Sequence, residues 1–224
     1  MLRLVATLLI AGACALATPV GVPGLSGSRS TAPGGGLSGT EQWASGGFTI
    51  AWEITGSGSD WHYKYTMVIP EKGLSHWILQ LTPDCVDPGD AACVTGAKFN
   101  GSSVVTELNT FSGADPSNTG MPAPIIGVKF DSGSTGTLVY EFDSNRAPVW
   151  GSFFAIDGKN KGSDVYAFSN GLDNLDSVDV LDFIARPNGD GGGGGTGEIP
   201  EPGTVSLLGL GAALILFGRR FHRG

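Results

Sequence analysis

Residues 48–54 read FTIAWEI and residues 61–69 read WHYKYTMVI, and these two stretches decide the fold. In both, large apolar side chains occupy every second position, with polar residues such as Glu53 and Lys64 between them. A period of two places successive side chains on opposite faces of an extended chain, so each stretch predicts a strand with one buried face. The short Gly- and Ser-containing connection between them is typical of neighbouring antiparallel strands.

The same alternation, interrupted by Gly, Asp, Asn and Pro, recurs along the rest of the central region. Further strands are predicted at residues 75–82, 103–108, 124–130, 136–142, 149–156 and 165–168. We therefore expect an all-β protein, an antiparallel β-sandwich of about eight strands with a jelly-roll or immunoglobulin-like arrangement. Residues 174–187 (NLDSVDVLDFIARP) fit either a last strand or a short helix.

The phase of the alternation also predicts which side chains fill the core. The residues expected between the sheets are Trp52, Tyr63, Tyr65, Leu79, Val128, Phe130 and Phe142. The residues expected on the outside are His62, Lys64 and Lys129. A shift of one residue in the register of any strand would exchange its two faces.

Composition divides the chain into segments around this domain. Residues 1–17 combine Arg3, a short apolar run and a small-residue ending, which predicts a signal peptide cleaved after Ala17; a lipoprotein signal cleaved before Cys14 is the alternative. Residues 18–40 are rich in Gly, Pro, Ser and Thr and are expected to form a flexible leader. The sandwich is expected at residues 41–187, followed by a Gly-rich linker at 188–198.

Cysteine use agrees with export. Removal of the signal peptide leaves Cys85 and Cys93, with seven residues between them that include a Pro-Gly turn. In an oxidising compartment this pair is expected to form a disulfide. The alternative, a metal site, would need further Cys or His ligands nearby in the sequence, and the sequence offers none.

Charge and motif content argue against several functions. The formal net charge is −8, which disfavours binding to nucleic acid phosphates. His62 and His76 are the only histidines of residues 41–187, and that region has no G-x-S-x-G motif, so we expect no catalytic residues, no cofactor and no enzyme.

Two alternatives stay open for the domain. One is calcium binding by clustered carboxylates, weighed against Asp residues that simply favour turns; the clusters are Asp84, Asp87 and Asp90, and Asp173, Asp176, Asp179 and Asp182. Residues 157–164 resemble the start of an EF-hand loop, but Lys159 and Lys161 stand where oxygen ligands are needed and rule that motif out. The other is a carbohydrate-binding face, for which Trp43 and Trp150 are the least constrained of the five tryptophans.

The end of the chain carries a three-part pattern. Pro200, Glu201 and Pro202 precede 16 residues without a charge, 203–218, and Arg219 and Arg220 follow. As a helix, residues 203–218 would span about 24 Å, short of the ~30 Å of a bilayer core but long enough to cross with snorkelling arginines. The arginines predict that the terminus lies in the cytoplasm and the acidic domain outside.

This order of motif, apolar segment and arginine cluster at residues 199–224 closely resembles the PEP-CTERM sorting signal. The resemblance implies recognition by an exosortase, a membrane-embedded cysteine protease or transpeptidase-like enzyme of Gram-negative bacteria that make exopolysaccharide. It implies that Pro200, Glu201 and Pro202 are the recognised motif and that Arg219 and Arg220 form the retention end. An uncharacterised group of PEP-CTERM proteins also resembles this chain at residues 72–81, 117–131 and 146–159. This second resemblance implies no enzymatic activity.

Together these features predict a protein exported through the inner membrane, transiently anchored there by one C-terminal transmembrane helix, and then found at the cell surface or outside. The expected role is structural or adhesive in the cell envelope or the extracellular matrix, with an exosortase as processing partner. The alternative is a carbohydrate-binding module that binds extracellular polysaccharide. A secreted hydrolase is the third possibility.

Overall fold

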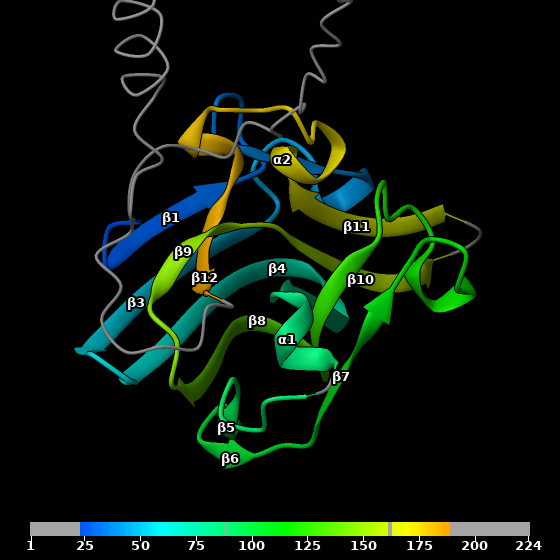
Figure 1. The fold of residues 1–224 in the computed structure, drawn as a ribbon. Coiled ribbons are helices and arrows are strands. Elements are labelled where there is room, and N and C mark those ends of the chain that lie inside the picture. Colours follow the sequence, from blue (N-terminus) through cyan, green and yellow to red (C-terminus); the bar gives the residue numbers. More distant parts are fainter. Residues whose placement is uncertain (1–22, 88, 161–162, 189–224) are drawn as a thin grey trace, which may run out of the picture.

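The computed structural model describes residues 23–87, 89–160 and 163–188. This part of the chain consists mainly of antiparallel strands, arranged as one ten-stranded sheet and one two-stranded sheet (Figure 1). The expectation of an all-β antiparallel protein is confirmed. The described residues form twelve strands rather than about eight. Two predicted strands are each divided in two, two pairs of predicted strands are each merged into one, and four strands, at residues 26–30, 37–39, 95–99 and 184–187, are additional.

Two long strands form the centre of the large sheet. β4 (Asp60–Gln80) pairs with β8 (Ile125–Ser144) along nearly their whole length. The first half of β4 also pairs with β3 (Thr49–Ser57), and its second half pairs with β10 (Phe153–Asn160). β4 and β8 therefore connect all the remaining strands of the large sheet.

Two of the observed strands each combine two strands that the sequence predicted separately. β4 combines the strands predicted at residues 61–69 and 75–82, and β8 combines those predicted at residues 124–130 and 136–142. The Pro- and Gly-containing residues between 69 and 74 predict a turn by composition, but the register between β4 and β8 only shifts there. Lys72 adopts a positive φ of 64°, which accommodates the irregularity within the strand. Each interruption is therefore a bulge in a continuous strand.

The other strands are shorter and surround this centre. They are β1 (Ser26–Ser30), β2 (Leu37–Gly39), β5 (Thr95–Phe99), β6 (Ser102–Ser103), β7 (Thr106–Phe111), β9 (Pro148–Gly151), β11 (Ser163–Ser169) and β12 (Ile184–Pro187). The helical turns are η1 (Glu41–Trp43), α1 (Pro83–Val86), η2 (Pro116–Asn118), α2 (Asn170–Asp173) and η3 (Val180–Asp182).

The leader predicted at residues 18–40 is wrong where the structure describes it. β1 pairs with β3, and β2 pairs with β11. These residues bury little apolar surface of their own, but backbone hydrogen bonds to existing strands fix them. Gly27 lies directly against the indole of Trp52, so a β-carbon at this position would overlap the ring. Composition alone does not reveal that these residues form two strands of the large sheet.

Residues 149–156, predicted as one strand, contribute to two sheets. β9 pairs with β12 in the small sheet, and β10 continues from Phe153 in the large one. The open question over residues 174–187 is resolved because both alternatives occur: η3 comes first and β12 follows. Residues 103–108 are likewise divided between β6 and β7.

The small sheet packs on the face of the large sheet that carries the aromatic residues. In Figure 1, β9 and β12 lie across β3 and β4. The Tyr65 hydroxyl donates to the carbonyl of Ala185 on β12 over 2.8 Å, and the Tyr63 hydroxyl donates to the carbonyl of Arg146 over 2.7 Å. Ile184 and Ala185 are themselves buried in the main core.

The predicted core is confirmed: all seven of its named residues are buried. Rings stack between β4 and β8, with centroid distances of 5.3 Å for Tyr63–Phe142 and 4.9 Å for Trp77–Phe130. His62, Lys64 and Lys129 are partly exposed, as expected for the opposite face. A second cluster that includes Ile78 and Phe154 covers that opposite face near the end of β4, so this stretch is buried on both sides.

Candidate functional site

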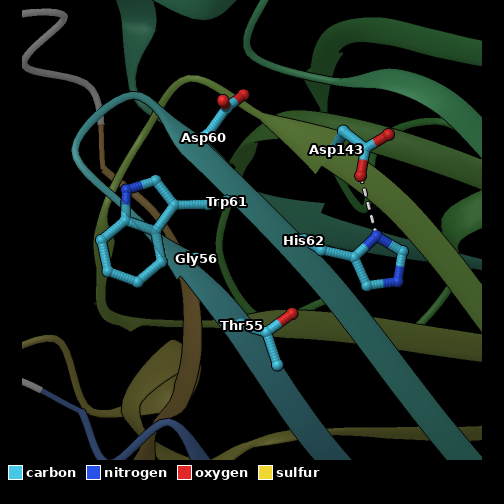
Figure 2. Close-up of a pocket in the computed structure, with 6 residues that line it drawn as sticks. All are labelled: Thr55, Gly56, Asp60, Trp61, His62 and Asp143. Atoms are coloured by element: carbon cyan, nitrogen blue, oxygen red, sulfur yellow. Dashed lines mark hydrogen bonds and ion pairs between the residues drawn. The ribbon is translucent and has the colours of Figure 1, made fainter.

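Three neighbouring strands bring a hydroxyl, an imidazole and a carboxylate into one row. Thr55 on β3 is the register partner of His62 on β4, and His62 is the partner of Asp143 on β8. With Gly56, Asp60 and Trp61 they line an open pocket of about 250 Å³ (Figure 2). Sequence analysis could not pair His62 with Asp143, because 81 residues separate them.

The geometry of this row defines what it can do chemically. His62 Nδ1 lies 2.8 Å from Asp143 Oδ1 and both side chains are exposed to solvent (Figure 2). A carboxylate accepts a hydrogen bond, so His62 Nδ1 is the donor in this contact. Within the described residues, the Thr55 hydroxyl makes no hydrogen bond to His62, so the hydroxyl–imidazole link of a hydrolytic triad is not formed. An exposed pair of this kind contributes about 0.2–1 kcal/mol to stability.

The second histidine of the domain is part of the packing. His76 is buried, and its Nε2 lies 2.9 Å from Asn118 Oδ1 of the η2 turn. Burial lowers the pKa of His76; the hydrogen bond to Asn118 and the carboxylates Asp131 and Asp115 act in the opposite direction, and Lys129 adds to the lowering. A neutral, covered imidazole of this kind supports the fold and does not reach a substrate.

His76 predicts a pH dependence of stability. Its pKa is lowered in the folded state, whereas an unfolded histidine titrates near pH 6.5. Below that pH the unfolded chain binds a proton that the folded chain resists, so the free energy of unfolding falls as the pH decreases from about 6.5. Urea unfolding at a series of pH values should show this loss in the wild type and a smaller loss in His76→Gln. An equal loss in both proteins would contradict the assignment, and His62→Gln serves as the control for the exposed histidine.

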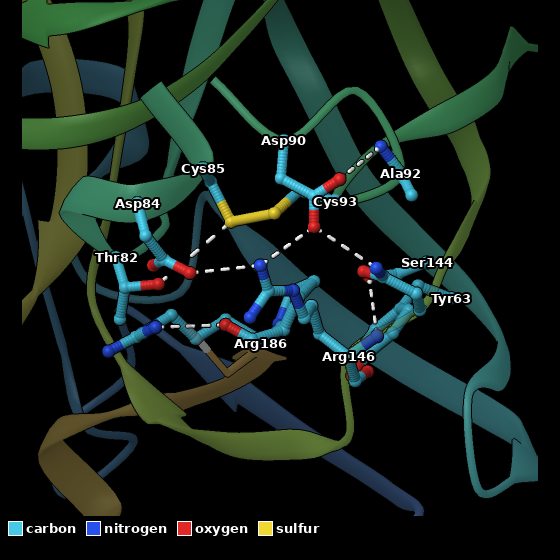
Figure 3. The surroundings of a disulfide bond; sticks show 12 residues. Tyr63, Thr82, Asp84, Cys85, Asp90, Ala92, Cys93, Ser144, Arg146 and Arg186 are labelled. Atoms are coloured by element: carbon cyan, nitrogen blue, oxygen red, sulfur yellow. Dashed lines mark hydrogen bonds and ion pairs between the residues drawn. A yellow bond between two sulfur atoms is a disulfide. The ribbon is translucent and has the colours of Figure 1, made fainter. Parts of the chain in front are cut away.

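The predicted disulfide is confirmed. Cys85 of α1 is bonded to Cys93, with 5.7 Å between their Cα atoms, and both residues are buried (Figure 3). Beside it, Arg146 Nη2 lies 2.9 Å from Asp84 Oδ2 and 2.8 Å from Asp90 Oδ2, and the Arg146 side chain is only 3% exposed. The disulfide loop is thus attached to the segment that follows β8.

Hydrogen bonds explain why the pKa of the Asp90 carboxyl group is lowered. Asp90 accepts from the Asn145 amide, the Ala92 backbone and Arg146, and these bonds, the one from Asn145 first, lower the pKa of Asp90. Two of the three acidic residues that suggested calcium near the cysteines therefore bind an arginine. Sequence analysis missed Arg146, because it is 56 residues from Asp90.

A second arginine, also missed from sequence, lies near this cluster on β12. Arg186 donates from Nη1 to the carbonyl of Pro187 over 2.9 Å, and its side chain lies so close to Gly151 of β9 that a β-carbon there would overlap it. Burial lowers the pKa of Arg186 to about 10, against the opposing effect of Tyr65 and Tyr63. The Arg186 guanidinium of the small sheet therefore interacts electrostatically with the tyrosines of β4.

Loss of the disulfide is expected to cost about 2–3 kcal/mol of unfolding free energy, because a closed loop of this size restricts the unfolded chain. The double variant Cys85→Ala/Cys93→Ala should retain the fold, since Arg146 still holds Asp84 and Asp90. Urea unfolding with and without a reducing agent measures the effect, and the double variant should be insensitive to the reductant. Free thiols in non-reducing peptide mapping of the exported protein would contradict the bond.

The two tryptophans considered for sugar binding are not free to stack on a ligand. Trp43 is buried, and its Nε1 donates to the carbonyl of Glu71 over 3.0 Å. Trp150 is half-buried and meets Trp52 edge-on at 6.1 Å, with the Arg29 guanidinium over its ring. In the described part of the chain, the large apolar side chains that are strongly exposed are aliphatic.

Two of the other acidic candidates, Asp179 and Asp182, have structural partners. Asp179 accepts from the backbone of Leu181 and caps η3, and Asp182 accepts from Ser177 and Asn170. Over the ranges that the structure describes, no group of three or more Cys, His, Asp or Glu residues is arranged to hold a metal ion.

The predicted sorting residues lie outside the described residues; they are Pro200, Glu201, Pro202, Arg219 and Arg220. So do the signal peptide at 1–17 and the membrane segment predicted at 203–218. In the part that is described, no helix is long and apolar enough to span a membrane.

Comparison with known proteins identifies the tail. Residues 198–223 match the PEP-CTERM protein-sorting motif. This confirms the resemblance seen in the sequence and is consistent with a substrate of an exosortase. Neither a curated protein nor a solved structure matches the chain. The motif supports export of the protein and its sorting to the cell surface.

Proposed function

We propose that this protein is a non-enzymatic structural or adhesive domain of the cell envelope, delivered by its C-terminal tail and released when an exosortase cleaves that tail. The observation that carries the proposal is the PEP-CTERM motif at residues 198–223. In this proposal residues 203–218 hold the protein in the inner membrane until processing, and the acidic domain faces outward.

The chemistry of the described domain supports a structural role. Three of its reactive side chains serve cohesion: the two cysteines form a disulfide, and His76 packs against Asn118. The buried arginine Arg146 binds Asp84 and Asp90. A disulfide suits a protein that works outside the cell, because such bonds form and persist in oxidising environments.

The proposal is tested by dependence on the processing enzyme. The protein is expressed in a host that has its exosortase and in the same host with that gene deleted, and membrane and medium fractions are compared. With the enzyme, we expect a shortened form outside the membrane fraction. Without it, we expect the full tail to be retained in the membrane. An identical distribution and length in the two hosts would refute processing by this route.

A further inference from the structure

One loop of the domain exposes aliphatic side chains to solvent although it is well fixed. Residues 173–182, which we call the acidic-aliphatic loop, run from the end of α2 through η3 (Figure 1). Leu175 is 63% exposed, Val178 62%, Leu181 46% and Val180 36%. Four of the seven strongly exposed large apolar residues of the described chain thus lie within seven consecutive positions. A concentration of this kind marks an interaction surface more often than a solvated one.

Hydrogen bonds hold the loop in this conformation. Arg29 of β1 donates from Nε to the carbonyl of Leu181 and from Nη2 to the carbonyl of Val180, both over 2.8 Å. The Arg29 guanidinium also lies 5.1 Å from the centre of the Trp52 ring. Asp182 binds Ser177 and Asn170 at the other side of the loop. The aliphatic side chains are therefore presented by an ordered backbone, which reduces the entropy lost when a partner binds.

The charges of the loop restrict the chemistry of that partner. Asp173 and Asp176 are exposed beside Leu175, and residues 163–185 contain no Lys or Arg. Arg29 lies against the loop and interacts with Asp179 and Asp182, so the charge of Asp173 and Asp176 stays uncompensated by it. An anionic lipid surface would repel this loop. A complementary partner presents an apolar patch bordered by basic side chains.

The position of the loop in the chain indicates which partner this is. The described domain ends at Asn188, and the eleven residues 189–199 separate it from Pro200 of the sorting motif. Whatever their arrangement, these residues span at most about 40 Å. Any enzyme that binds the motif must therefore work within that distance of the end of the domain, and the loop lies only a few residues before that end.

We propose that the acidic-aliphatic loop is a second contact for the membrane enzyme that processes the sorting motif, through an apolar surface with a basic rim on the outward side of that enzyme. This inference rests on the proposed function. A linked second contact acts at high effective concentration once the motif is bound, and so raises the affinity for the substrate beyond that of the motif alone.

The test measures the rate of tail removal by pulse-chase when the enzyme is limiting. In the full chain, Leu175→Ser/Val178→Ser should slow removal at least about fivefold, as expected for loss of two central interface side chains. The matched control is Val105→Ser, an exposed valine on the connection between β6 and β7, which should process within about twofold of the wild type. Thermal unfolding should be unchanged in both variants, because these side chains are exposed. Removal of the tail at the wild-type rate in the loop variant would overturn the proposal.

Further experiments test whether the partner is basic, whether the sorting motif is recognised, and whether the loop binds lipid instead. Asp173→Asn/Asp176→Asn should also slow removal, and a wild-type rate there would exclude a basic partner. Glu201→Ala in the same host tests the proposed function by itself: a blocked Glu201 variant beside a normal loop variant would refute only the loop contact. If the released protein floats with vesicles of anionic phospholipid and Leu175→Ser/Val178→Ser abolishes this, the surface binds lipid and the proposal is wrong.

Discussion

Glu201→Ala is expected to leave the protein uncleaved in the inner membrane, still carrying residues 203–224. Glu201 is the only charge of the Pro-Glu-Pro motif, Pro202 favours an extended conformation at Glu201, and neither proline has an amide N–H to donate. An enzyme that recognises the motif loses the single charged group it can pair with. Removal of such a group usually costs several kcal/mol when its partner is buried, so processing should fall by more than about 100-fold.

This substitution discriminates between sorting and a plain membrane anchor. In a plain anchor Glu201 is a solvated acid outside the apolar segment, and its loss leaves residues 203–218 and the arginines unchanged. The double variant Arg219→Ala/Arg220→Ala should impair topology under both interpretations, so it reports only on insertion. Wild type and Glu201→Ala are compared by the mass of the protein in membrane and medium fractions. Equal release of both would leave an ordinary anchored domain with a coincidental motif.

Trp77→Ala should be the most destabilising single substitution in the described domain. Trp77 is fully buried, and its ring lies 4.9 Å from that of Phe130 and 5.3 Å from those of Tyr65 and Tyr140. Truncation removes these contacts and leaves a cavity in the aromatic layer on the core face of β4 and β8, which costs about 3–5 kcal/mol. A typical domain has only about 5–15 kcal/mol of stability, so the variant should unfold at a much lower urea concentration.

The conservative variant at the same position gives the matched comparison. The Trp77 indole N–H finds no acceptor among the described residues, and an unpaired buried donor costs about 1–3 kcal/mol. Trp77→Phe removes that donor and keeps most of the ring, so its loss of stability should be much smaller than that of Trp77→Ala. Val105→Ala, at an exposed site, should have almost no effect. Similar losses for Trp77→Ala and Val105→Ala would show that the aromatic layer does not form the core.

Much of the fold was predictable, because alternation is a local property. Trp52, Tyr63 and Phe142 are buried as the phase of their strands indicates, and the short spacing of Cys85 and Cys93 identifies their bond. The prediction failed where non-local pairing compensates for composition. β1 is polar and short, yet backbone bonds to β3 and the contacts of Arg29 place it in the sheet.

Less of the candidate site inside the domain was predictable. The neighbours of His62 and Arg146 come from strands or loops far away in the sequence, and no local pattern identifies Asp143 or Asp90 as the partners. The burial of Trp43 was also not predictable. Trp43 lies in η1 and not in an alternating strand, so no periodic pattern marks it as buried. The sorting motif is different, because recognition of a linear tail depends on the order of residues along the chain, which the sequence displays directly.

Intact-mass analysis of the wild-type protein, exported by a host with its exosortase, shows whether the tail is removed as a sorting signal. We expect a main species that begins at Thr18 and has lost the apolar segment 203–218 with everything after it, with the two-hydrogen decrease in mass of one disulfide. A main species whose mass still includes residues 203–224 would show that the tail is not a processed sorting signal.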